Sequence, residues 1–355
     1  MSRTRMKAGV SVSAQGRQPG YLTMRRIALC LLALWLHGTA ANAWPNEQAL
    51  EQELGRLAQL PSGTLGVAVV HVESGRSAFV NADEPYPMAS TFKVPVAVQL
   101  LHLVDEQSLR LDRMIDLAPA DLAPGSGMIT SLLDDPGVSL SLRNLLELML
   151  LISDNTAADL MLREAGGPDA VNARLRALGV EGMRVDRSTL SLIADALGTA
   201  APAPESRTRA GYETLFDALP EDAVKTARAA FAADPRDTSS PRAMAELLAK
   251  IWRGQALSDA STALLIDIMS RCQTGQARLK GMLPIGTEVA HKTGTIAGSA
   301  NDVGVITLPH DAGHVIVAAF VKGSDAEMAA RERAIADVAR AAHDYFLFAP
   351  QATAR

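Results

Sequence analysis

The stretch Met88-Ala89-Ser90-Thr91-Phe92-Lys93 is the key to this chain, because it places a hydroxyl and an amine one helical turn apart. If a helix begins at Ser90, the i,i+3 spacing brings the Lys93 side chain back over that of Ser90. A neutral lysine at this position could take the proton of the serine. Backbone N–H groups at the helix start would then face the negative charge that develops beside the serine. The stretch therefore predicts acyl transfer through a tetrahedral oxyanion.

The composition is that of an ordinary globular protein. Of the 355 residues, 48% are hydrophobic and 21% are charged, and the net charge is −5. This length is enough for one large domain or two smaller ones with a real core. An acidic balance without a Lys/Arg-rich run argues against nucleic acid as the main partner. With 4% aromatic residues, a stacking platform for bases or long glycans is not expected.

The amino-terminal segment is predicted to be an export signal. Arg25-Arg26 precede the apolar run 27–36, and Ala41-Asn42-Ala43 has the small-x-small pattern that export peptidases cut after. The apolar run is too short to span a membrane comfortably. A buried amino-terminal helix is the alternative. Residues 1–43 are thus expected to be an extension and a cleaved signal, which leaves a periplasmic or secreted protein.

Only two cysteines are present. Cys30 lies in the segment that would be removed, and Leu29 before it does not suit a lipoprotein signal. Cys272 remains alone, so no intramolecular disulfide is expected. It lies in an apparently helical apolar stretch without a nearby histidine, so a catalytic thiol is not predicted.

The order of the predicted elements places strands at both ends of the chain and helices in the middle. A hairpin of strands is predicted over 65–81, and the signals from 90 to about 283 are almost all helical. Strands return at 288–295, 302–308 and 314–321, before a closing helix over 326–346. This order predicts an α+β fold of two lobes, with a five-stranded antiparallel sheet from both chain ends and an inserted all-helical lobe.

The predicted domain boundaries follow from this order. Residues 44–89 and 285–355 would form the α/β lobe, and 90–284 the helical lobe, which carries a long loop over 187–240. A cleft between two lobes is the natural place for a small ligand.

Two further triplets lie in positions that suit the first. Ser153-Asp154-Asn155 falls between two apolar helices, and Lys292-Thr293-Gly294-Thr295 ends a strand. Either alone is compatible with a helix-capping turn or an ordinary strand end. Their order, spacing and element types together match the motif set of serine acyl transferases.

With these three motifs the chain resembles the class A β-lactamases and related penicillin-recognising serine hydrolases. The resemblance covers residues 46–348 and includes the supporting segments 145–160, 165–168, 237–241 and 291–302. It implies the two-lobed fold and a serine hydrolase that opens the β-lactam ring of penicillin- and cephalosporin-type antibiotics through an acyl-serine intermediate. We expect a monomer that needs no cofactor and has no stable membrane insertion. No metal is expected either, because no His/Cys/Asp cluster has metal-ligand spacing.

The resemblance assigns roles in acylation. Ser90 would be the nucleophile and Lys93 its proton partner, kept near neutral by burial and a neighbouring positive charge. Ser153 would pass a proton to the departing lactam nitrogen, with Lys292 holding that hydroxyl acidic. The backbone N–H groups of Ser90 and Thr295 would form the oxyanion hole.

Other motif residues would hold the substrate or the loop. Asn155 would bind the substrate's side-chain amide, whereas Asp154 is expected to fix the loop. Lys292 and the hydroxyls of Thr293 and Thr295 would face the substrate carboxylate. Gly294 would let the strand edge approach the ligand closely.

Many family members add an arginine for the carboxylate from the strand that corresponds to 315–321, which has none here. Arg278, in a segment that supplies the arginine in other members, is the candidate to replace it, against the alternative of a solvent-exposed arginine. His314 is a weaker candidate.

The chain departs from the family after Arg187. The family has a glutamate two residues after this arginine and an asparagine four residues after the glutamate, and the two position the hydrolytic water. This chain has Thr189 and Ile193 at those positions. The loop is longer by roughly thirty to forty residues and contains a predicted helix over 212–231. An ion pair between Arg187 and Asp237 is still expected to close it.

This departure leaves alternatives open. Glu205, Glu213 or Glu221 of the insertion could replace the missing base, although each is equally an ordinary solvated charge. Without the glutamate the protein could be a slow-turnover penicillin-binding sensor or a D-amino-acid peptidase of the same fold. A non-catalytic peptidoglycan-binding module is a third possibility, which intact Ser90 and Lys93 disfavour.

Overall fold

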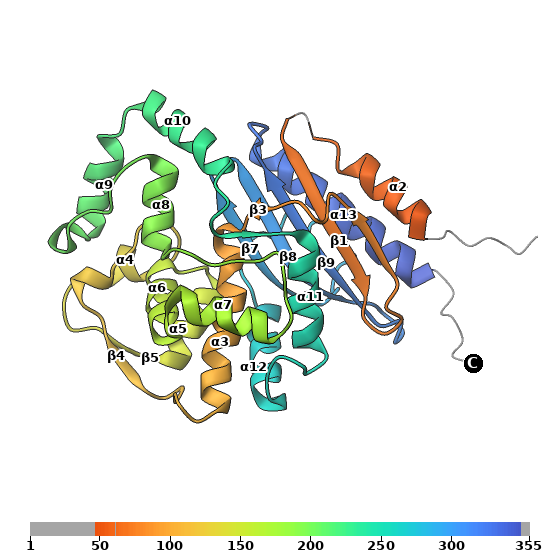
Figure 1. Ribbon diagram of the computed structural model, residues 1–355, viewed down its shortest axis with the longest axis horizontal. Helices are drawn as coiled ribbons and strands as arrows, with labels where there is room; N and C mark the ends of the chain where they lie inside the picture. Colours follow the sequence, from red (N-terminus) through yellow and green to blue (C-terminus); the bar gives the residue numbers. More distant parts are fainter. Residues whose placement is uncertain (1–46, 61, 349–355) are drawn as a thin grey trace, which may run out of the picture. The chain divides into compact units, whose positions relative to one another are not determined.

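The computed structural model describes residues 47–60 and 62–348, so the predicted export signal lies outside the described residues. A five-stranded antiparallel sheet in the order β2-β1-β9-β8-β7 forms its centre (Figure 1). Its strands are β1 (Thr64–His71), β2 (Ser77–Val80), β7 (Val289–Ile296), β8 (Ser299–Thr307) and β9 (His314–Lys322). The prediction of one sheet built from both chain ends is confirmed, and β7 is an edge strand.

Both faces of the sheet are covered. The central strands β9 and β8 are buried along almost their whole length. The sequence of β9 is accordingly a nearly continuous apolar run, whereas β8 also buries the polar residues Ser299, Asn301 and Asp302. Helices α2 (Glu47–Leu57) and α13 (Met328–Phe348) pack on one face, over a core that includes Leu54, Val317 and Ile335 (Figure 1). The other face joins the larger core of the helical lobe.

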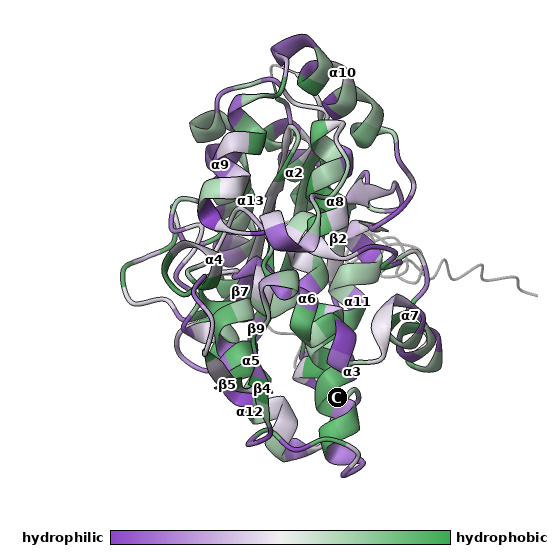
Figure 2. Ribbon diagram, turned by 90° about the vertical axis from the view of Figure 1, so that its left-hand side faces the viewer, coloured by the Kyte–Doolittle hydropathy of each residue, from purple (hydrophilic) through white to green (hydrophobic). Residues whose placement is uncertain are grey.

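The helical lobe is built around α3, which is buried along its first nine residues. Such a helix, apolar on all sides, belongs in the interior of a large domain (Figure 2). The helices are α3 (Lys93–Asp105), α4 (Ile129–Leu132), α5 (Leu142–Leu151), α6 (Asn155–Glu164), α7 (Gly167–Ala177), α8 (Thr189–Leu197), α11 (Pro241–Trp252) and α12 (Asp259–Ser270). Serine or aspartate side chains cap the amino ends of α5, α6, α8, α11 and α12.

The prediction that the middle of the chain is almost all helical missed two small sheets. Strand β3 (Tyr86–Pro87) pairs with β6 (Thr238–Ser239), and β4 (Met114–Asp116) pairs with β5 (Ser139–Ser141). Strands of two or three residues are too short to show a hydrophobic period. The first of these pairs ties the end of the long loop to the segment that leads into Ser90.

The insertion differs from its prediction as well. The single helix expected over 212–231 is two helices, α9 (Arg209–Asp217) and α10 (Glu221–Ala232), interrupted at Pro220. Proline lacks an N–H and disfavours the helical conformation in the residue before it. Tyr212 anchors α9, and its hydroxyl donates to the Leu122 carbonyl at 2.7 Å. Phe231 anchors α10 against α8.

None of the helices within 47–60 and 62–348 combines the length and apolar character needed to cross a bilayer.

Candidate active site

Ser90 lies in a short 3-10 helix, Ala89–Phe92, and the α-helix α3 begins only at Lys93. The prediction of an α-helix starting at Ser90 is therefore wrong in detail, although the two residues remain one turn apart. Ala89 has φ of +46°, a conformation that costs an L-residue energy and clusters at functional sites. Ser90 is half-buried, while Ala89, Thr91 and Phe92 are buried, so the serine is the accessible member of its turn.

Lys93 is fully buried, and its amine meets the Ser153 segment. Nζ donates to the Ser153 carbonyl at 2.6 Å, to Ser153 Oγ at 3.1 Å and to Asn155 Oδ1 at 2.8 Å. Within the described residues its hydrogen bonds do not include Ser90 Oγ, which the sequence had predicted as its partner. A buried amine needs acceptors, and the turn between α5 and α6 supplies several at once.

Ser153 links the two motif lysines, Lys93 and Lys292. It occupies the turn before α6 with φ of +60°, and it is 5% exposed. Its Oγ accepts from Lys93 Nζ at 3.1 Å and from Lys292 Nζ at 3.0 Å. A hydroxyl between two amines can donate its own proton to a third group and be resupplied by either amine.

The two residues after Ser153 have different tasks. Asp154 caps α6 by accepting from Ala157 N at 2.9 Å, and it also accepts from the N–H groups of Met128 and Ile129. These bonds use its carboxylate to fix the loop, as predicted. Asn155 accepts from Lys93 and donates through Nδ2 to the Pro124 carbonyl at 2.7 Å.

Burial controls the charge of both lysines. Removal from water, together with the positive charge of Lys292, holds the pKa of Lys93 well below its ordinary value. Burial also lowers the pKa of Lys292, to about 8, although the negative charges of Cys272 and Asp302 oppose this. The lowered pKa thus favours the neutral form of Lys93, whereas Lys292, with a pKa of about 8, is mostly charged at neutral pH.

Strand β7 lies directly against the turn that holds Ser90. A Cβ on Gly294 would come within 2.5 Å of the Met88 carbonyl and 3.1 Å of Ser90 N, so only glycine permits this contact. Thr293 Oγ1 is 2.6 Å from Thr274 Oγ1, whereas Thr295 is exposed. The two predicted oxyanion donors, at Ser90 and Thr295, thus belong to the accessible residues on the two sides of the site.

Arg278 is buried against β7 rather than exposed. Its guanidinium donates to the carbonyls of Gly294 and Asn301 at 3.0 and 2.9 Å and to Thr295 Oγ1 at 2.7 Å. Its Nε pairs with Glu332 at 3.2 Å. Arg278 therefore packs against the end of β7, and its guanidinium contacts the exposed Thr295.

His314 is not part of the site, so the weaker prediction is wrong. It begins β9 opposite Thr307, whereas Thr295 aligns with Ala300 and Val321 at the other end of the sheet. The offset of seven positions from His314 to Val321 corresponds to roughly 23 Å of strand. Its side chain pairs with Glu73 at 2.6 Å.

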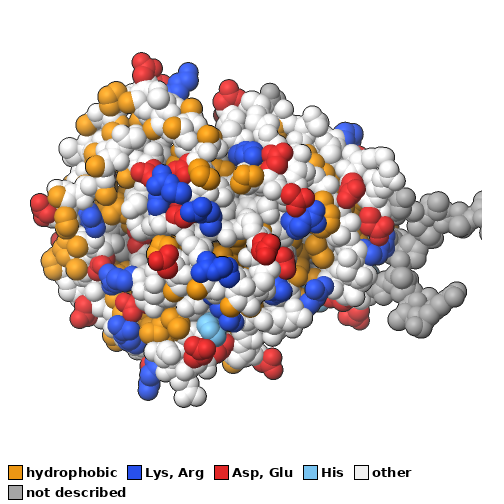
Figure 3. Space-filling view, in the orientation of Figure 1, with side chains coloured by type: hydrophobic (Ala, Val, Ile, Leu, Met, Phe, Trp, Pro, Cys, Tyr) orange, Lys and Arg blue, Asp and Glu red, His pale blue; other side chains and the backbone are white. Residues whose placement is uncertain are grey.

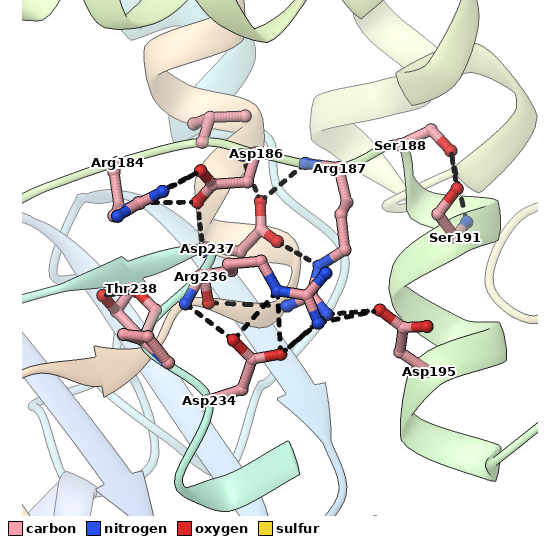
Figure 4. Close-up of polar contacts among 12 residues, drawn as sticks. Arg184, Asp186, Arg187, Ser188, Ser191, Asp195, Asp234, Arg236, Asp237 and Thr238 are labelled. Atoms are coloured by element: carbon pink, nitrogen blue, oxygen red, sulfur yellow. Dashed lines mark hydrogen bonds and ion pairs between the residues drawn. The ribbon is translucent and has the colours of Figure 1, made fainter.

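The predicted ion pair between Arg187 and Asp237 is present, and it is part of a larger network of ion pairs in the long loop. Arg187 Nε pairs with Asp237 at 2.5 Å, and Nη1 pairs with Asp195 at 2.6 Å and Asp234 at 3.0 Å (Figure 4). Arg187 also lies over the Phe231 ring, 5.3 Å from its centre. One buried arginine thus joins both ends of the loop to α8 and α10.

Thr189 and Ile193 occupy the first turns of α8. Thr189 is buried, and Ile193 lines a small apolar hollow with Leu190, Tyr212 and Phe216. Because α9 of the insertion closes this hollow, an apolar residue at 193 fits where the family has asparagine. Glu205, Glu213 and Glu221 of the insertion are all solvent-exposed.

Asp159 is a site residue that the sequence analysis did not identify. This carboxylate, on α6 one turn after Asn155, accepts from the N–H groups of Thr189 and Leu190 and interacts with Lys93. Burial raises its pKa, and the two N–H groups partly offset this. The i,i+4 spacing from Asn155 was the available signal.

Cys272 has a histidine neighbour, contrary to the prediction. It is buried just after α12, beside His291, whose Nδ1 lies 2.9 Å from Asp302 Oδ1. Burial raises the thiol pKa, but His291 and Lys292 outweigh it and lower the value to about 7. Burial lowers the pKa of His291, yet Asp302 and Cys272 raise it to about 9. Cys272 and His291 are thus a buried pair that interacts with Lys292 and is not exposed at the surface.

No cluster of three or more His, Cys, Asp or Glu side chains suited to a metal ion occurs within 47–60 and 62–348. The residues that lie at the site are instead the accessible Ser90, the two buried lysines Lys93 and Lys292, and a second serine, Ser153. This fold and this combination define a serine hydrolase of the acyl-transferring class.

Comparison with known proteins identifies the family. The model of the "Beta-lactamase enzyme family" matches residues 49–346. The chain is 30% identical to the extended-spectrum β-lactamase PER-1 of Pseudomonas aeruginosa, over 84% of this chain and 87% of that protein. It is 28% identical to β-lactamase VEB-1 of the same organism, over 91% of this chain and 98% of that protein.

Solved structures agree. An ancestral class A β-lactamase of Gram-negative bacteria is 34% identical, with a TM-score of 0.68 over 82% of this chain and 98% of that one. A β-lactamase from Chitinophaga pinensis is 31% identical, with a TM-score of 0.67 over 83% and 98% of the two chains. The chain belongs to the β-lactamase enzyme family and, within it, to the class A serine enzymes.

Proposed function

We propose that the protein is an exported hydrolase that opens the ring of penicillin- and cephalosporin-type β-lactams with Ser90 as its nucleophile. One observation carries the proposal: Lys93 and Lys292 both donate a hydrogen bond to Ser153 Oγ. Lys93 itself follows the accessible Ser90 by one helical turn. This arrangement joins the three sequence motifs into one proton-transferring unit.

In the acylation step the Ser90 oxygen bonds to the lactam carbonyl carbon, and the carbon–nitrogen bond of the ring breaks. Lys93, whose lowered pKa favours its neutral form, takes the Ser90 proton. Ser153 then donates its proton to the departing nitrogen and is reprotonated from Lys93. The carbonyl oxygen carries the negative charge between these events.

The N–H groups of Ser90 and Thr295 support that charge. Removing one donor of this kind costs about 3 kcal/mol in the barrier. The cation Lys292 attracts the substrate carboxylate, with Thr293 and Thr295 as hydroxyl donors beside it. Arg278 adds positive charge and orients Thr295 Oγ1. Asn155, once Lys93 moves toward Ser90, is free to bind the side-chain amide of the substrate.

Deacylation is the slower step in this proposal. Thr189 occupies the position at which related enzymes carry the glutamate that acts as general base. Its side chain is buried beside Asp159. Glu205, Glu213 and Glu221 lie on the exposed side of the insertion. These features favour a long-lived acyl-enzyme and keep a penicillin-binding sensor as the second candidate function.

Two measurements test these proposals. Ser90→Ala should abolish nitrocefin hydrolysis, and retained hydrolysis would exclude Ser90 as the nucleophile. Intact masses recorded over minutes after mixing with benzylpenicillin should show an adduct that decays. An adduct that persists for hours supports the sensor, and the absence of any adduct supports a non-catalytic module.

Export and oligomeric state are part of the same proposal. The signal-like segment 25–43 supports a periplasmic or secreted protein, and we propose that it acts as a monomer. Cell fractionation with amino-terminal sequencing should find the mature chain beginning at Trp44 outside the cytoplasm. Light scattering of that mature chain should give the mass of a single copy.

A further inference from the structure

Helix α9 of the insertion contacts the segment 119–136, which precedes β5. Tyr212 of this helix forms a small apolar cluster with Ala123 and Leu190, and Leu215 packs against it. In Figure 1 α9 lies at the edge of the helical lobe next to α8 and α4, and hydrophobic side chains gather over this part of the surface in Figure 3. The insertion therefore joins the first turn of α8 to a segment that lies far from it in the sequence.

Tyr212 also makes a directed hydrogen bond to the segment 119–136. Its side chain is buried, and its hydroxyl donates to the Leu122 carbonyl at 2.7 Å. Leu122 is 2% exposed, so its carbonyl needs a donor from within the protein. Burial raises the pKa of Tyr212 to about 12, so the hydroxyl remains a donor at neutral pH. A second bond, from Arg209 N to Asp134 Oδ2 at 3.1 Å, fixes the start of α9 on the same segment.

The segment 119–136 in turn holds Asn155 of the proposed site. The Pro124 carbonyl accepts from Asn155 Nδ2 at 2.7 Å, and the Ser126 carbonyl accepts from the Asn155 N–H at 2.9 Å. Gly125 between them has φ of +91°, and a Cβ there would lie 3.0 Å from Asn155 Nδ2. The backbone of the segment thus passes directly over the Asn155 amide.

These contacts fix the direction in which the Asn155 amide faces. Its Oδ1 accepts from Lys93 Nζ at 2.8 Å, and its Nδ2 donates to Pro124 on the other side. Nδ2 carries two hydrogens, so the second remains for the carbonyl oxygen of a substrate's side-chain amide. The place of that donor therefore depends on the place of the Pro124 carbonyl.

The Leu122 and Pro124 carbonyls are closely linked along the chain. The two residues are two positions apart, which corresponds to at most roughly 7 Å of extended backbone. The ring of Pro124 fixes its own φ, which removes one of the few torsions that could absorb a shift. A displacement of the Leu122 carbonyl is thus passed on to the acceptor that holds Asn155.

We infer that Tyr212 is a positioning residue for substrate recognition, because it holds the Leu122 carbonyl and thereby places the Asn155 amide for the side-chain amide of a β-lactam. This inference rests on the proposed function and gives the insertion a part in it. The protein should then prefer β-lactams that carry a side-chain amide to those without one.

The test compares two penicillins. Benzylpenicillin has a side-chain amide, whereas 6-aminopenicillanic acid has the same ring system without the side-chain carbonyl. The second-order rate constant for acylation of Ser90 is measured for each by intact mass, so slow deacylation does not affect the result. The amide ratio is the constant for benzylpenicillin divided by that for 6-aminopenicillanic acid. It should be well above one for the wild type.

Tyr212→Phe keeps the buried ring and removes only the hydroxyl donor. The amide ratio should fall about fivefold, which is the size of effect expected for one neutral hydrogen bond. Thr214→Val is the matched control, because it removes a hydroxyl from the exposed side of α9 that donates to Ala210 of the same helix. Its amide ratio should stay within twofold of wild type.

A double variant shows whether the effect passes through Asn155. Asn155→Ala should lower the amide ratio by itself, because the donor for the substrate amide is removed. Adding Tyr212→Phe to Asn155→Ala should then lower the amide ratio no further. A further fivefold loss in the double variant would mean that Tyr212 acts without Asn155, which contradicts the inference.

An amide ratio that is unchanged in Tyr212→Phe would overturn the inference, and so would equal losses for both penicillins, since a merely structural role affects both alike. Adduct formation by the wild type reports the proposed function separately. If Ser90 is acylated and the amide ratio does not respond to Tyr212→Phe, the role of Tyr212 alone is wrong. If Ser90 forms no adduct with any β-lactam, both proposals are wrong.

Discussion

Lys93 and Lys292, both fully buried, donate to the same oxygen, Ser153 Oγ, at 3.1 and 3.0 Å. Two ammonium groups so close together repel each other, and burial adds to the cost of charging either one. The pair therefore favours a state with one neutral amine, which is the state that a proton acceptor for Ser90 requires. The hydroxyl between them is the route by which that proton can leave.

Replacing Ser153 by alanine should lower the acylation rate constant by at least about a hundredfold, because the proton relay to the lactam nitrogen is lost. Ser153→Gly should be equally slow but more stable than Ser153→Ala by about 1 kcal/mol, since glycine accepts the φ of +60° without strain. Stopped-flow acylation and urea unfolding measure the two effects. Acylation of the alanine variant within tenfold of wild type would exclude the relay.

Arg187→Ala should lower the free energy of unfolding by about 3 kcal/mol or more, because it leaves the buried carboxylate of Asp237 without its partner. Arg184→Ala is the matched control. Arg184 pairs with Asp186 at the exposed surface, so its loss should cost no more than about 0.5 kcal/mol. Urea denaturation compares them, and equal stabilities of the two variants would show that the Arg187 network does not hold the loop.

The acylation rate constant should fall as the pH rises above about 8. Lys292 has a pKa of about 8, so below this pH it is charged and attracts the substrate carboxylate, and above it that charge is lost. Cys272→Ser should move this fall to lower pH, because the thiolate, with a pKa of about 7, stabilises the Lys292 cation. At pH 6 the variant should match wild type. An identical alkaline profile in the two proteins would contradict the coupling.

A carboxylate introduced at position 189 should shorten the life of the acyl-enzyme. In Thr189→Glu/Asp159→Asn the new glutamate takes the place of the family's base, and the second change removes the adjacent buried negative charge. We expect the penicilloyl adduct to decay at least about tenfold faster than in Thr189→Gln/Asp159→Asn, which has the same shape without a base. Intact mass against time measures the decay. Equal lifetimes would mean that another group activates the water.

Much of the site was predictable from local patterns. The three motifs fixed which residue types lie at the first turn after β3, between two helices and at the end of β7. The apolar runs of β1 and β9 predicted strands, and both are strands that are buried along most of their length. The break between α9 and α10 was also readable, since Pro220 interrupts the helical pattern.

Contacts between distant segments could not be obtained in this way. The sequence paired Lys93 with Ser90, three residues away, yet the buried amine found its acceptors on Ser153 and Asn155. Arg278 had no local sign of burial, and Cys272 had no local sign of His291. Each of these depends on which segments the fold brings together.

The sequence by itself thus determined the chemistry that is available: a serine, two lysines and a second serine, on elements whose type follows from hydrophobic period and turn residues. Only the tertiary structure decided which of these groups touch and which carry charge. The physical reason is that hydrophobic patterning depends on neighbours a few residues apart, whereas hydrogen-bond partners, burial and therefore pKa depend on segments that lie far apart in the chain and meet only when it folds.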